Sequence, residues 1–450
     1  YNAPIKNKEM NMTERHQELQ SMIDNAKAGY ESIEGNLLEL GNAYTCQMPE
    51  MVRQSLQKRG KSSLFFPAAP SIALKTYTSI VTTYFSNPDI ATSTPEDPND
   101  PAMGKAAEAI QESLRYYERH KLLNLFPVLS REFLNACVYL GCAVKVYWDG
   151  DAPRVDGIKL RDLWFDPAAT SIRDAQYLVP RMYIPRYKVQ KLAKKNGFSL
   201  SAEHLAGLQA ATNINERNQK QPEKYQLIEI FDIYERNENS WQLSTMLGNE
   251  IILRDSYPLN DGLPIFFGRL LPQLTMSNEY DSVEMYGSSP LEYVLPLQSE
   301  MNQIRNQQLD AIRLQLEPRY LFQKGSGVNP FTFYNQRIHL VNDVGGVKEF
   351  KAPDTGQSNA QVGQLQLELQ DVSAVTPYNT GTTGSVGNQT ATGTAILTEE
   401  ANQRINVYIH SLNETLIEPM MGHLAKLIWR YGQTRFFKDV TLSRATDPDL

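Results

Sequence analysis

The spacing of apolar residues divides the first part of the chain into helices followed by strands. A period near 3.6 predicts helices at 10–43, 72–84, 102–120, 122–139 and 186–196. Runs of β-branched and aromatic residues predict strands at 144–148, 164–165, 175–184, 225–236, 241–247, 250–254 and 264–268. The polar, alanine-rich stretch 199–224 is expected to be a surface insertion. Residues 1–285 should therefore form one mixed α+β body, with helices first and the sheet later.

A long helix is predicted next. Ser288 or Ser289 is expected to be its N-cap, with Pro290 in the first helical position, where the missing N–H has no consequence. Apolar residues then recur near the helical period as far as Leu316. Glu317-Pro318 should end the helix, because the residue before proline avoids the α region.

After this helix the pattern changes twice. Short strands are expected at 319–322 and 338–341, between turns rich in glycine and proline. A second helix is expected at 361–375, and a third, very long one from Thr394 to Tyr431. Pro419 lies inside the third helix and should kink it by removing one hydrogen bond of the ladder.

The segment 379–393 contains almost no apolar side chain and no charge. Such a segment cannot bury itself, so we expect it to be mobile. It is either a loop facing a pore or a linker between independent domains. Its lack of charge and proline, and the helices predicted on both sides, argue against the linker.

Composition limits the classes of function. The net charge of −7 and the pI near 5.6 argue against a protein that grips phosphate backbones over a large surface. Cys46, Cys137 and Cys142 fit no disulfide framework and are expected to be buried thiols. We find no apolar run long enough to span a bilayer and no secretory signal.

One short motif bears on nucleotide binding. Arg59-Gly60-Lys61-Ser62 is the segment closest to a P-loop, but Ser55 stands where the first glycine should be and no strand precedes it. We expect basic residues of a surface loop there.

Carboxylates and histidines give only weak signals. Asp162 with Asp166, or Asp232 with Glu229, could hold a cation, and solvated strand ends or turn caps are the alternative. The six histidines are scattered and form no metal-binding pattern. No arrangement of nucleophile and base emerges from spacing. We therefore expect no catalytic residue, no metal site and no cofactor.

The order of elements after residue 285 resembles that of tailed-bacteriophage portal proteins. The local sequence is similar too, in Tyr286-Gly-Ser-Ser-Pro-Leu leading into Leu297-Gln298 and Asn302, and in Thr390-Ala-Thr-Gly-Thr-Ala395 before the last helix. The resemblance implies a portal-like α+β fold with these parts: a wing at 1–285, stem helices at 286–318 and 361–376, a clip at 319–360, a tunnel loop at 377–393, and a kinked tunnel helix at 394–450 that returns to the wing or begins a crown.

The same resemblance implies a function. Portal proteins form a ring, usually of twelve copies, at the unique vertex of the capsid, and double-stranded DNA is packaged and ejected through it. The expected partners are other copies of the chain, DNA held transiently and without sequence specificity, the large terminase subunit, head-completion or tail adaptor proteins, and major capsid and scaffolding proteins. Such a protein is no enzyme, assembles in the host cytoplasm, resides in the virion and contacts no membrane. An acidic chain suits a channel whose walls must not hold DNA.

The resemblance also assigns residues. Glu368 and Asp371 would line the channel, or merely pair with Arg305 or Arg313 of a neighbouring helix. The clip would dock DNA or the packaging motor through basic residues, or be an ordinary solvated β surface; these residues are Arg319, Lys324, Arg337, Lys348 and Lys351. The tunnel loop would contact DNA through Thr380, Gly381, Thr382, Thr383, Gly384, Ser385, Asn388, Gln389 and Thr390.

Two other functional classes remain open. The chain could be an enzyme or regulator that binds nucleic acid or a small ligand through residues 1–285, although catalytic patterns are missing. A membrane pore-former is a third class, which the lack of a lipid-facing segment disfavours. The native mass separates these classes, since only a portal requires a ring of many copies.

Overall fold

The computed structural model describes residues 3–432 except 87–88, 96, 98, 121, 151, 197–199, 201–204, 206, 209–217, 219, 239, 249, 274–284, 317–319, 323–346, 350–355 and 374–402. The fold is mixed α+β, as predicted. The chain divides into two compact units. We call residues 1–40, 73–290 and 402–450 the sheet unit, and residues 41–72 and 291–401 the helix-pair unit.

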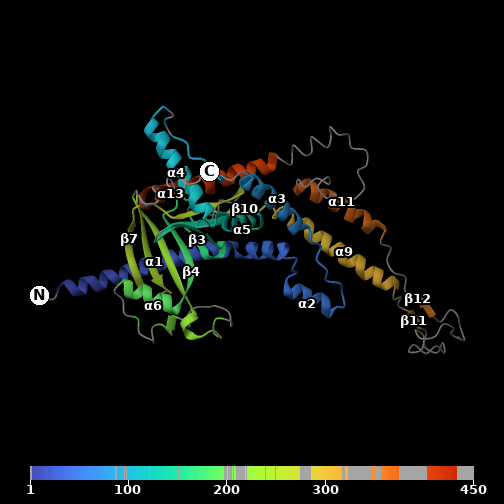
Figure 1. Ribbon diagram of the computed structural model, residues 1–450. Coiled ribbons are helices and arrows are strands. Elements are labelled where there is room, and N and C mark those ends of the chain that lie inside the picture. The colour runs from blue at the N-terminus through green and yellow to red at the C-terminus, as the bar shows by residue number, and fades with distance from the viewer. Residues whose placement is uncertain are drawn as a thin grey trace. The chain divides into compact units, whose positions relative to one another are not determined.

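The sheet unit contains two antiparallel sheets (Figure 1). The larger has the strand order β3-β4-β5-β6-β7, the smaller β2-β1-β8, and a short pair joins β9 to β10. The strands are β1 (Cys142–Asp149), β2 (Ala152–Ile158), β3 (Leu163–Phe165), β4 (Tyr177–Pro185), β5 (Leu227–Asn237), β6 (Ser240–Leu247), β7 (Ile251–Leu259), β8 (Ile265–Gly268), β9 (Leu271–Pro272) and β10 (Gly287–Ser288). Glu238 and Gly248, with φ of 50° each, make the turns of the β5–β6–β7 meander.

Helices cover these sheets. They are α1 (Ala3–Tyr44), α3 (Ala68–Phe85), α4 (Pro101–Arg119), α5 (Leu125–Val138), α6 (Arg186–Lys195) and α13 (Glu418–Tyr431). The five helices predicted between residues 10 and 196 are thus confirmed. Asp100 caps α4 by accepting a hydrogen bond from the Ala102 N–H at 2.8 Å, and Pro101 occupies the first helical position.

The core of the sheet unit lies among α3, α4, α5, β1, β2 and the last helix. Phe133 of α5 is fully buried, and its ring stacks on that of Tyr84 with 4.9 Å between centroids. The last helix contributes one continuous buried face, made of Leu412, Leu416, Met420, Leu424, Leu427 and Ile428. Each such side chain contributes about 1.5–3 kcal/mol to stability. This apolar face is the pattern from which the helix was predicted.

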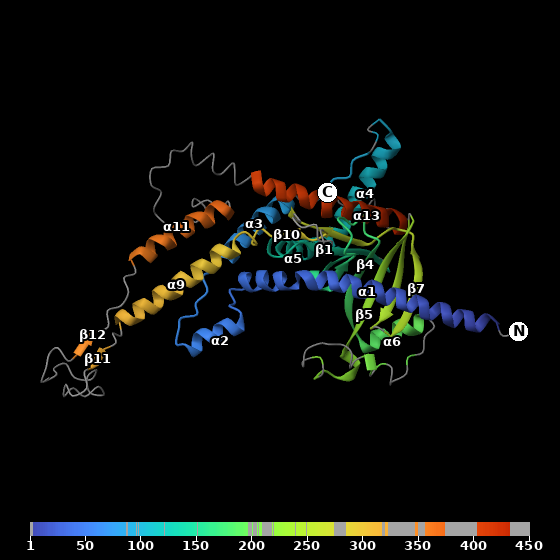
Figure 2. The same cartoon turned by 180° about the vertical axis from the view of Figure 1, so that it is seen from behind.

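The first helix lies against the five-stranded sheet (Figures 1 and 2). The Arg15 guanidinium donates to Glu235 of β5 at 2.6 Å and to Asp255 of β7 at 3.1 Å. Further along, the ring of Tyr30 stacks on Trp164 of β3, with 6.2 Å between centroids. Polar and aromatic contacts therefore fix both ends of this packing.

The helix-pair unit contains α2 (Glu50–Lys58), α9 (Leu295–Leu316), β11 (Tyr320–Phe322), β12 (Val347–Glu349) and α11 (Gly356–Ser373). Helices α9 and α11 contact each other, as Figure 2 shows in gold and orange. Strand β11 pairs antiparallel with β12. Residues 61–67, between α2 and α3, are neither helix nor strand, and we call them the strap. The predicted second helix and the first short strand are confirmed, whereas the predicted strand 338–341 lies outside the described residues.

The start of α9 differs from the prediction. The helix begins at Leu295, and residues 290–294 form turns. Ser288 belongs to β10, and the buried Ser289 hydroxyl donates to the carbonyl oxygen of Val138 at 2.9 Å. Ser288 is held in β10 and Ser289 against the end of α5, and the helix starts only at Leu295, so the sequence motif misplaced the helix start.

Other differences have equally local causes. Helix α3 begins before Pro70, because proline is tolerated in the first helical turn. Strand β2 escaped prediction, since Pro153 and Gly157 interrupt its pattern; a Cβ at Gly157 would collide with the Glu132 carboxylate beneath it. Within 199–224, Leu205 and Leu208 are buried in a cluster with residues of β5 and α6, so these two residues do not lie on the surface as predicted.

Candidate channel and docking site

Helix α9 presents a row of polar side chains, one at every fourth residue. Three of the four are amides, and all three are buried. The row consists of Gln298, Asn302, Asn306 and Asp310. Four helical residues rise about 6.0 Å, and two residues of an extended chain span about 6.6 Å. An extended segment beside the row can therefore meet it with every second residue.

The strap makes this match. The Asn302 side-chain oxygen accepts a hydrogen bond from the backbone N–H of Phe66 at 2.7 Å. One turn on, the Asn306 carboxamide accepts from the N–H of Leu64 at 2.8 Å and donates to the carbonyl of the same residue at 2.9 Å. These side chains take the place of a neighbouring strand, because the strap's backbone groups find their partners on a helix.

Both ends of the row make additional contacts. The Gln298 side-chain oxygen accepts from the N–H groups of Ala68 and Ala69, both at 3.1 Å, and so caps α3. Asp310 accepts from the N–H and the hydroxyl of Ser62 at 2.9 and 2.8 Å, and Lys61 lies 3.6 Å away. Burial opposes ionisation of Asp310, but these bonds outweigh it and lower its pKa. The regular four-residue spacing is visible in the sequence, but the sequence does not show that an extended segment lies beside it.

The motif Arg59-Gly60-Lys61-Ser62 has a structural role. It follows helix α2, and Gly60 has a left-handed φ of 65°. The Gly60 N–H bonds the Gln57 carbonyl at 2.9 Å, and the Lys61 N–H bonds the Leu56 carbonyl at 2.9 Å. This pair of bonds is a Schellman motif, which ends a helix. The glycine and lysine therefore close α2 instead of cradling a phosphate.

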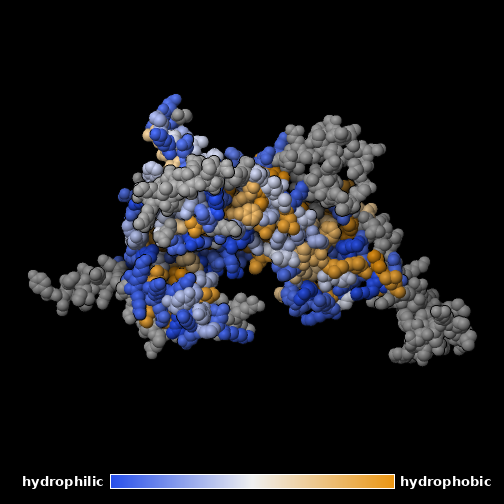
Figure 3. Space-filling view, viewed as in Figure 1, coloured by the Kyte–Doolittle hydropathy of each residue, from blue (hydrophilic) through white to orange (hydrophobic). Residues whose placement is uncertain are grey.

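Apolar side chains remain exposed near the strap. Leu64 is 60% exposed, Ile312 40% and Leu316 78%. They line a hollow of about 580 Å³ between the strap and the last turns of α9. Figure 3 shows hydrophobic residues, in orange, gathered along α9.

The predicted channel residues lie on α11. Leu365 is buried, while Glu368 is half-buried and accepts a hydrogen bond from Gln364 at 3.1 Å. Among the described residues, Glu368 forms no ion pair with Arg305 or Arg313. Asp371 belongs to the same helix, and its side chain lies outside the described part.

The other predicted site residues are mostly beyond the described part. Lys348 lies in β12, paired with Leu321 of β11. Arg319, Lys324, Arg337, Lys351 and the whole predicted tunnel loop, 377–393, lie outside it.

A π-helical turn interrupts the last helix at Asn413–Ile417, directly before Pro419. Proline lacks the N–H for the usual bond and its ring crowds the carbonyl four residues back, so the wider turn relieves both problems. The ladder is thus disturbed where the sequence predicted, in the form of a π turn. Thr415 uses its hydroxyl to bond the Ser411 carbonyl at 2.6 Å.

The first carboxylate pair proposed as a cation site has internal partners. Asp162 accepts from the Arg181 guanidinium at 2.8 Å. Asp166 accepts from the N–H groups of Ala168 and Gln176 at 3.1 and 3.2 Å, and so closes a turn. Asp162 and Asp166 therefore fit the alternative prediction, that they lie at strand ends or cap turns.

The carboxylates of the second pair, Asp232 and Glu229, also have partners within the protein. Asp232 lies 3.5 Å from the Lys145 ammonium and accepts from the Thr245 hydroxyl at 2.8 Å. Glu229 accepts from the Tyr183 hydroxyl at 3.3 Å, and burial raises its pKa. The described residues contain no cluster of three or more metal-ligating side chains.

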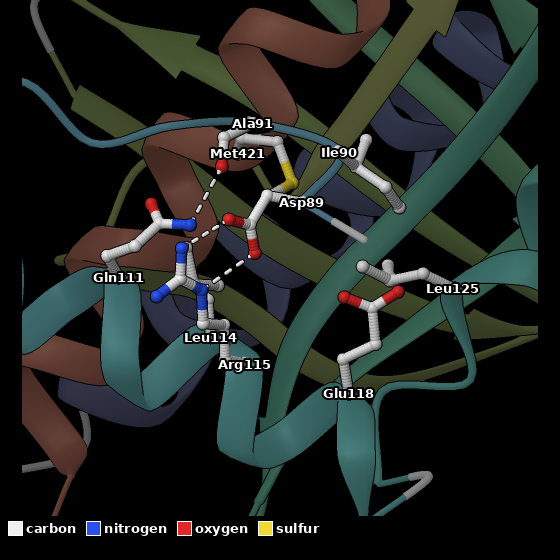
Figure 4. A pocket seen from close by; sticks show the side chains of 9 residues that line it. All are labelled: Asp89, Ile90, Ala91, Gln111, Leu114, Arg115, Glu118, Leu125 and Met421. Carbon is white, nitrogen blue, oxygen red and sulfur yellow. Dashed lines mark hydrogen bonds and ion pairs between the residues drawn. The ribbon is translucent and has the colours of Figure 1, made fainter. Parts of the chain in front are cut away.

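A small cavity lined by both charged and apolar side chains lies between α4 and α13 (Figure 4). Arg115 binds both carboxylate oxygens of Asp89, and Gln111 donates to the Ala91 carbonyl at 3.2 Å. Glu118 faces the same space, and burial followed by the charge of Asp89 raises its pKa. The cavity holds about 10 Å³, the space of one water molecule, which is too small for a nucleotide.

Among the described residues, no helix is long and apolar enough to cross a bilayer. A family model described as Phage SU10 portal protein matches residues 150–437, more than half of the chain. No curated protein matches the sequence. The matched region contains the meander, the helix pair with its strands, and the helix with the π turn.

Proposed function

Because the chain belongs to the Phage SU10 portal protein family, we propose that it assembles into a closed, dodecameric ring with a channel for double-stranded DNA. Portal proteins are structural, non-enzymatic parts of the phage capsid that connect head and tail and serve genome packaging. A ring requires each copy to present two different, complementary surfaces.

The arrangement of α9, the β11–β12 pair and α11 carries this proposal. Two contacting helices joined through a small strand pair, within the matched region, correspond to the stem (286–318 and 361–376) and the clip (319–360) of a portal. The wing is then residues 1–285, although 41–72 group with the helix pair. The tunnel helix is 394–450.

The proposed channel wall is acidic or neutral. The two charged residues of α11, Glu368 and Asp371, are both acidic, and the chain as a whole carries a charge of −7. A wall without a continuous basic surface makes few charge-assisted phosphate contacts, so DNA slides instead of being held.

The proposed clip docks the large terminase subunit during packaging and a head-completion or tail adaptor afterwards, through Arg319, Lys324, Arg337, Lys348 and Lys351. Major capsid and scaffolding proteins contact the rest of the ring, which assembles in the host cytoplasm. Replacing 319–360 by a short Gly/Ser linker should leave the sheet unit folded and abolish terminase capture. Undiminished capture would exclude the clip as the docking surface.

The proposed tunnel loop, 377–393, contains no lysine or arginine. Its hydroxyl and amide groups can make only weak, exchangeable hydrogen bonds to phosphate, so a ring of such loops contacts DNA without gripping it. Thr382→Lys with Thr383→Lys should slow packaging by adding a phosphate contact in every copy. Packaging at the normal rate would count against a loop that faces DNA.

The ring itself is tested through Leu365, whose side chain is buried. Leu365→Asp should separate α11 from α9 and reduce the ring fraction in native mass measurements, while the sheet unit keeps its melting temperature. The matched control is Gln366→Asp, because Gln366 is exposed on the same helix. Full rings of unchanged thermal stability in the Leu365 variant would contradict the stem assignment.

A further inference from the structure

Helix α2 is an amphipathic helix without a buried residue. It has nine residues, too few to be stable alone in water. Its Schellman motif satisfies backbone groups at the end of the helix but buries no apolar surface. Met51 is 86% exposed. A short helix of this kind requires a surface that covers it.

One face of α2 carries an apolar side chain at its start, a small one in the middle and basic ones at its end. Residues at spacings of three and four line a shallow hollow of about 330 Å³ along it: Met51, Gln54, Ser55, Lys58 and Arg59. Glu50, the acidic residue of α2, already pairs with Arg53 at 2.6 Å. Lys58 and Arg59 contact no carboxylate among the described residues. The charge on this face that no neighbouring side chain neutralises is therefore positive.

Helix α11 has an exposed face, and its only charged residues are acidic. Leu365 is directed to the buried side, and the residues around the opposite side are exposed, including Ala360, Gly363 and Leu367, the last by 61%. A Cβ added at Gly363 meets nothing within 4 Å, so another helix can approach closely there. The charged residues of α11 are both acidic, and Glu368 borders this face.

We propose that α2 of one copy packs on α11 of the next copy in the ring. With the two helices parallel, Met51 meets the small residues at Ala360 and Gly363, and Lys58 and Arg59 reach the acidic end of α11, which then borders both this interface and the proposed channel. The charges match in this direction, whereas in the reverse one Lys58 and Arg59 would face the uncharged start of α11, so the charges also favour one orientation. The two faces differ, as a heterologous, ring-closing interface requires. This inference rests on the proposed ring and names the surfaces that close it.

Cysteine crosslinking tests which chains touch. Ser55→Cys and Gly363→Cys are made in separate chains, which are mixed during assembly and oxidised. A crosslinked pair containing one chain of each kind is expected, because the two positions belong to different copies. With both substitutions in one chain, oxidation should give a ladder of multimers. The unmodified chain is the control, since Cys137 and Cys142 are buried and Cys46 is half-buried.

Charge reversal tests the chemistry. Lys58→Glu with Arg59→Glu, or Glu368→Lys with Asp371→Lys, should lower ring formation about tenfold or more, because like charges then face each other. All four changes in one chain should restore it. The control is Lys194→Glu with Lys195→Glu, two exposed positions of α6, which changes the net charge by the same amount as the α2 variant.

The outcomes separate this inference from the proposed function. If the unmodified chain forms no ring, the proposed function is wrong. If rings form but no crosslinked pair appears between the two single-cysteine chains, or if the charge reversals leave assembly unchanged, the ring stands and this interface is wrong. Oxidation that yields only internally linked single chains would also overturn it, by showing that α2 covers α11 of its own copy.

Discussion

The sheet unit and the helix-pair unit bury different kinds of side chain. In the sheet unit, α5 and the last helix bury continuous apolar faces around Phe133. In the helix-pair unit, most of the buried residues of α9 are amides, namely Gln298, Asn302, Asn306 and Gln308. Meanwhile Met51 and Leu316 are 86% and 78% exposed. The sheet unit thus has a large apolar core, whereas α9 of the helix-pair unit buries mainly amides.

This difference indicates what each unit needs. Apolar burial stabilises the sheet unit from within, at about 25 cal/mol per Å². A hydrogen bond in the strap adds only about 0.5–1.5 kcal/mol net, but it specifies which strap residue meets which helical turn. The hydrogen bonds therefore define the arrangement of the helix-pair unit but stabilise it only weakly. In the proposed ring, neighbouring copies would bury its exposed apolar side chains.

The largest expected effect comes from the core of the sheet unit. Phe133→Ala should lower the free energy of unfolding by about 3–5 kcal/mol, because it leaves a cavity beside Tyr84. Thermal or denaturant unfolding measures it. Phe126→Ala is the control, since Phe126 lies on the same helix but is 52% exposed. Equal losses in both variants would mean that the core is not where we place it.

A smaller but more selective effect is expected from the strap. Asn306→Ala removes the partners of both the N–H and the carbonyl of Leu64 and should destabilise the helix-pair unit by about 1–3 kcal/mol. Limited proteolysis should then cut within 61–67, while the unfolding of the sheet unit stays unchanged. Gln307→Ala is the control, because Gln307 is the exposed neighbour. Resistance of the strap to proteolysis would show that the amide row does not hold it.

Much of the fold could be predicted from the sequence, because periodicity reports burial. The face from Leu412 to Ile428 and the strands of the meander follow their apolar patterns directly. The start of α9 could not be predicted, since the engagement of Ser289 by α5 depends on tertiary contact. The strap was missed for the same reason: Asn302 and Asn306 resemble ordinary polar surface residues until the extended segment lies beside them.

The candidate site was less predictable than the fold. Glu368 does lie on an accessible helix, and Pro419 does follow a disturbed turn. The basic face of α2, however, could not be predicted, because the sequence does not show that Gly60 and Lys61 end a helix there. The tunnel loop and most of the basic clip residues stay predictions, because they rest on the family resemblance and lie outside the described residues.

The smallest effect concerns pH. Burial, followed by the charge of Lys426, lowers the pKa of His423, while Asp261 opposes this. The folded state then favours the neutral ring, so this contribution to stability is fully present above the ordinary pKa of about 6.5 and is lost below it, as the pH falls through the lowered pKa of the folded state. The melting temperature of the sheet unit should drop by a few degrees between pH 7.5 and 5.5. His423→Gln should flatten this dependence, and an equally steep profile in the variant would assign it to other groups.

The central claim is that this chain builds a ring-shaped portal, and the native mass of the purified chain tests it most directly, together with single-particle images of the same sample. The account predicts one dominant closed ring of roughly a dozen copies with a central channel. A sample that consists of monomers or dimers at micromolar concentration, with no rings in the images, would contradict it.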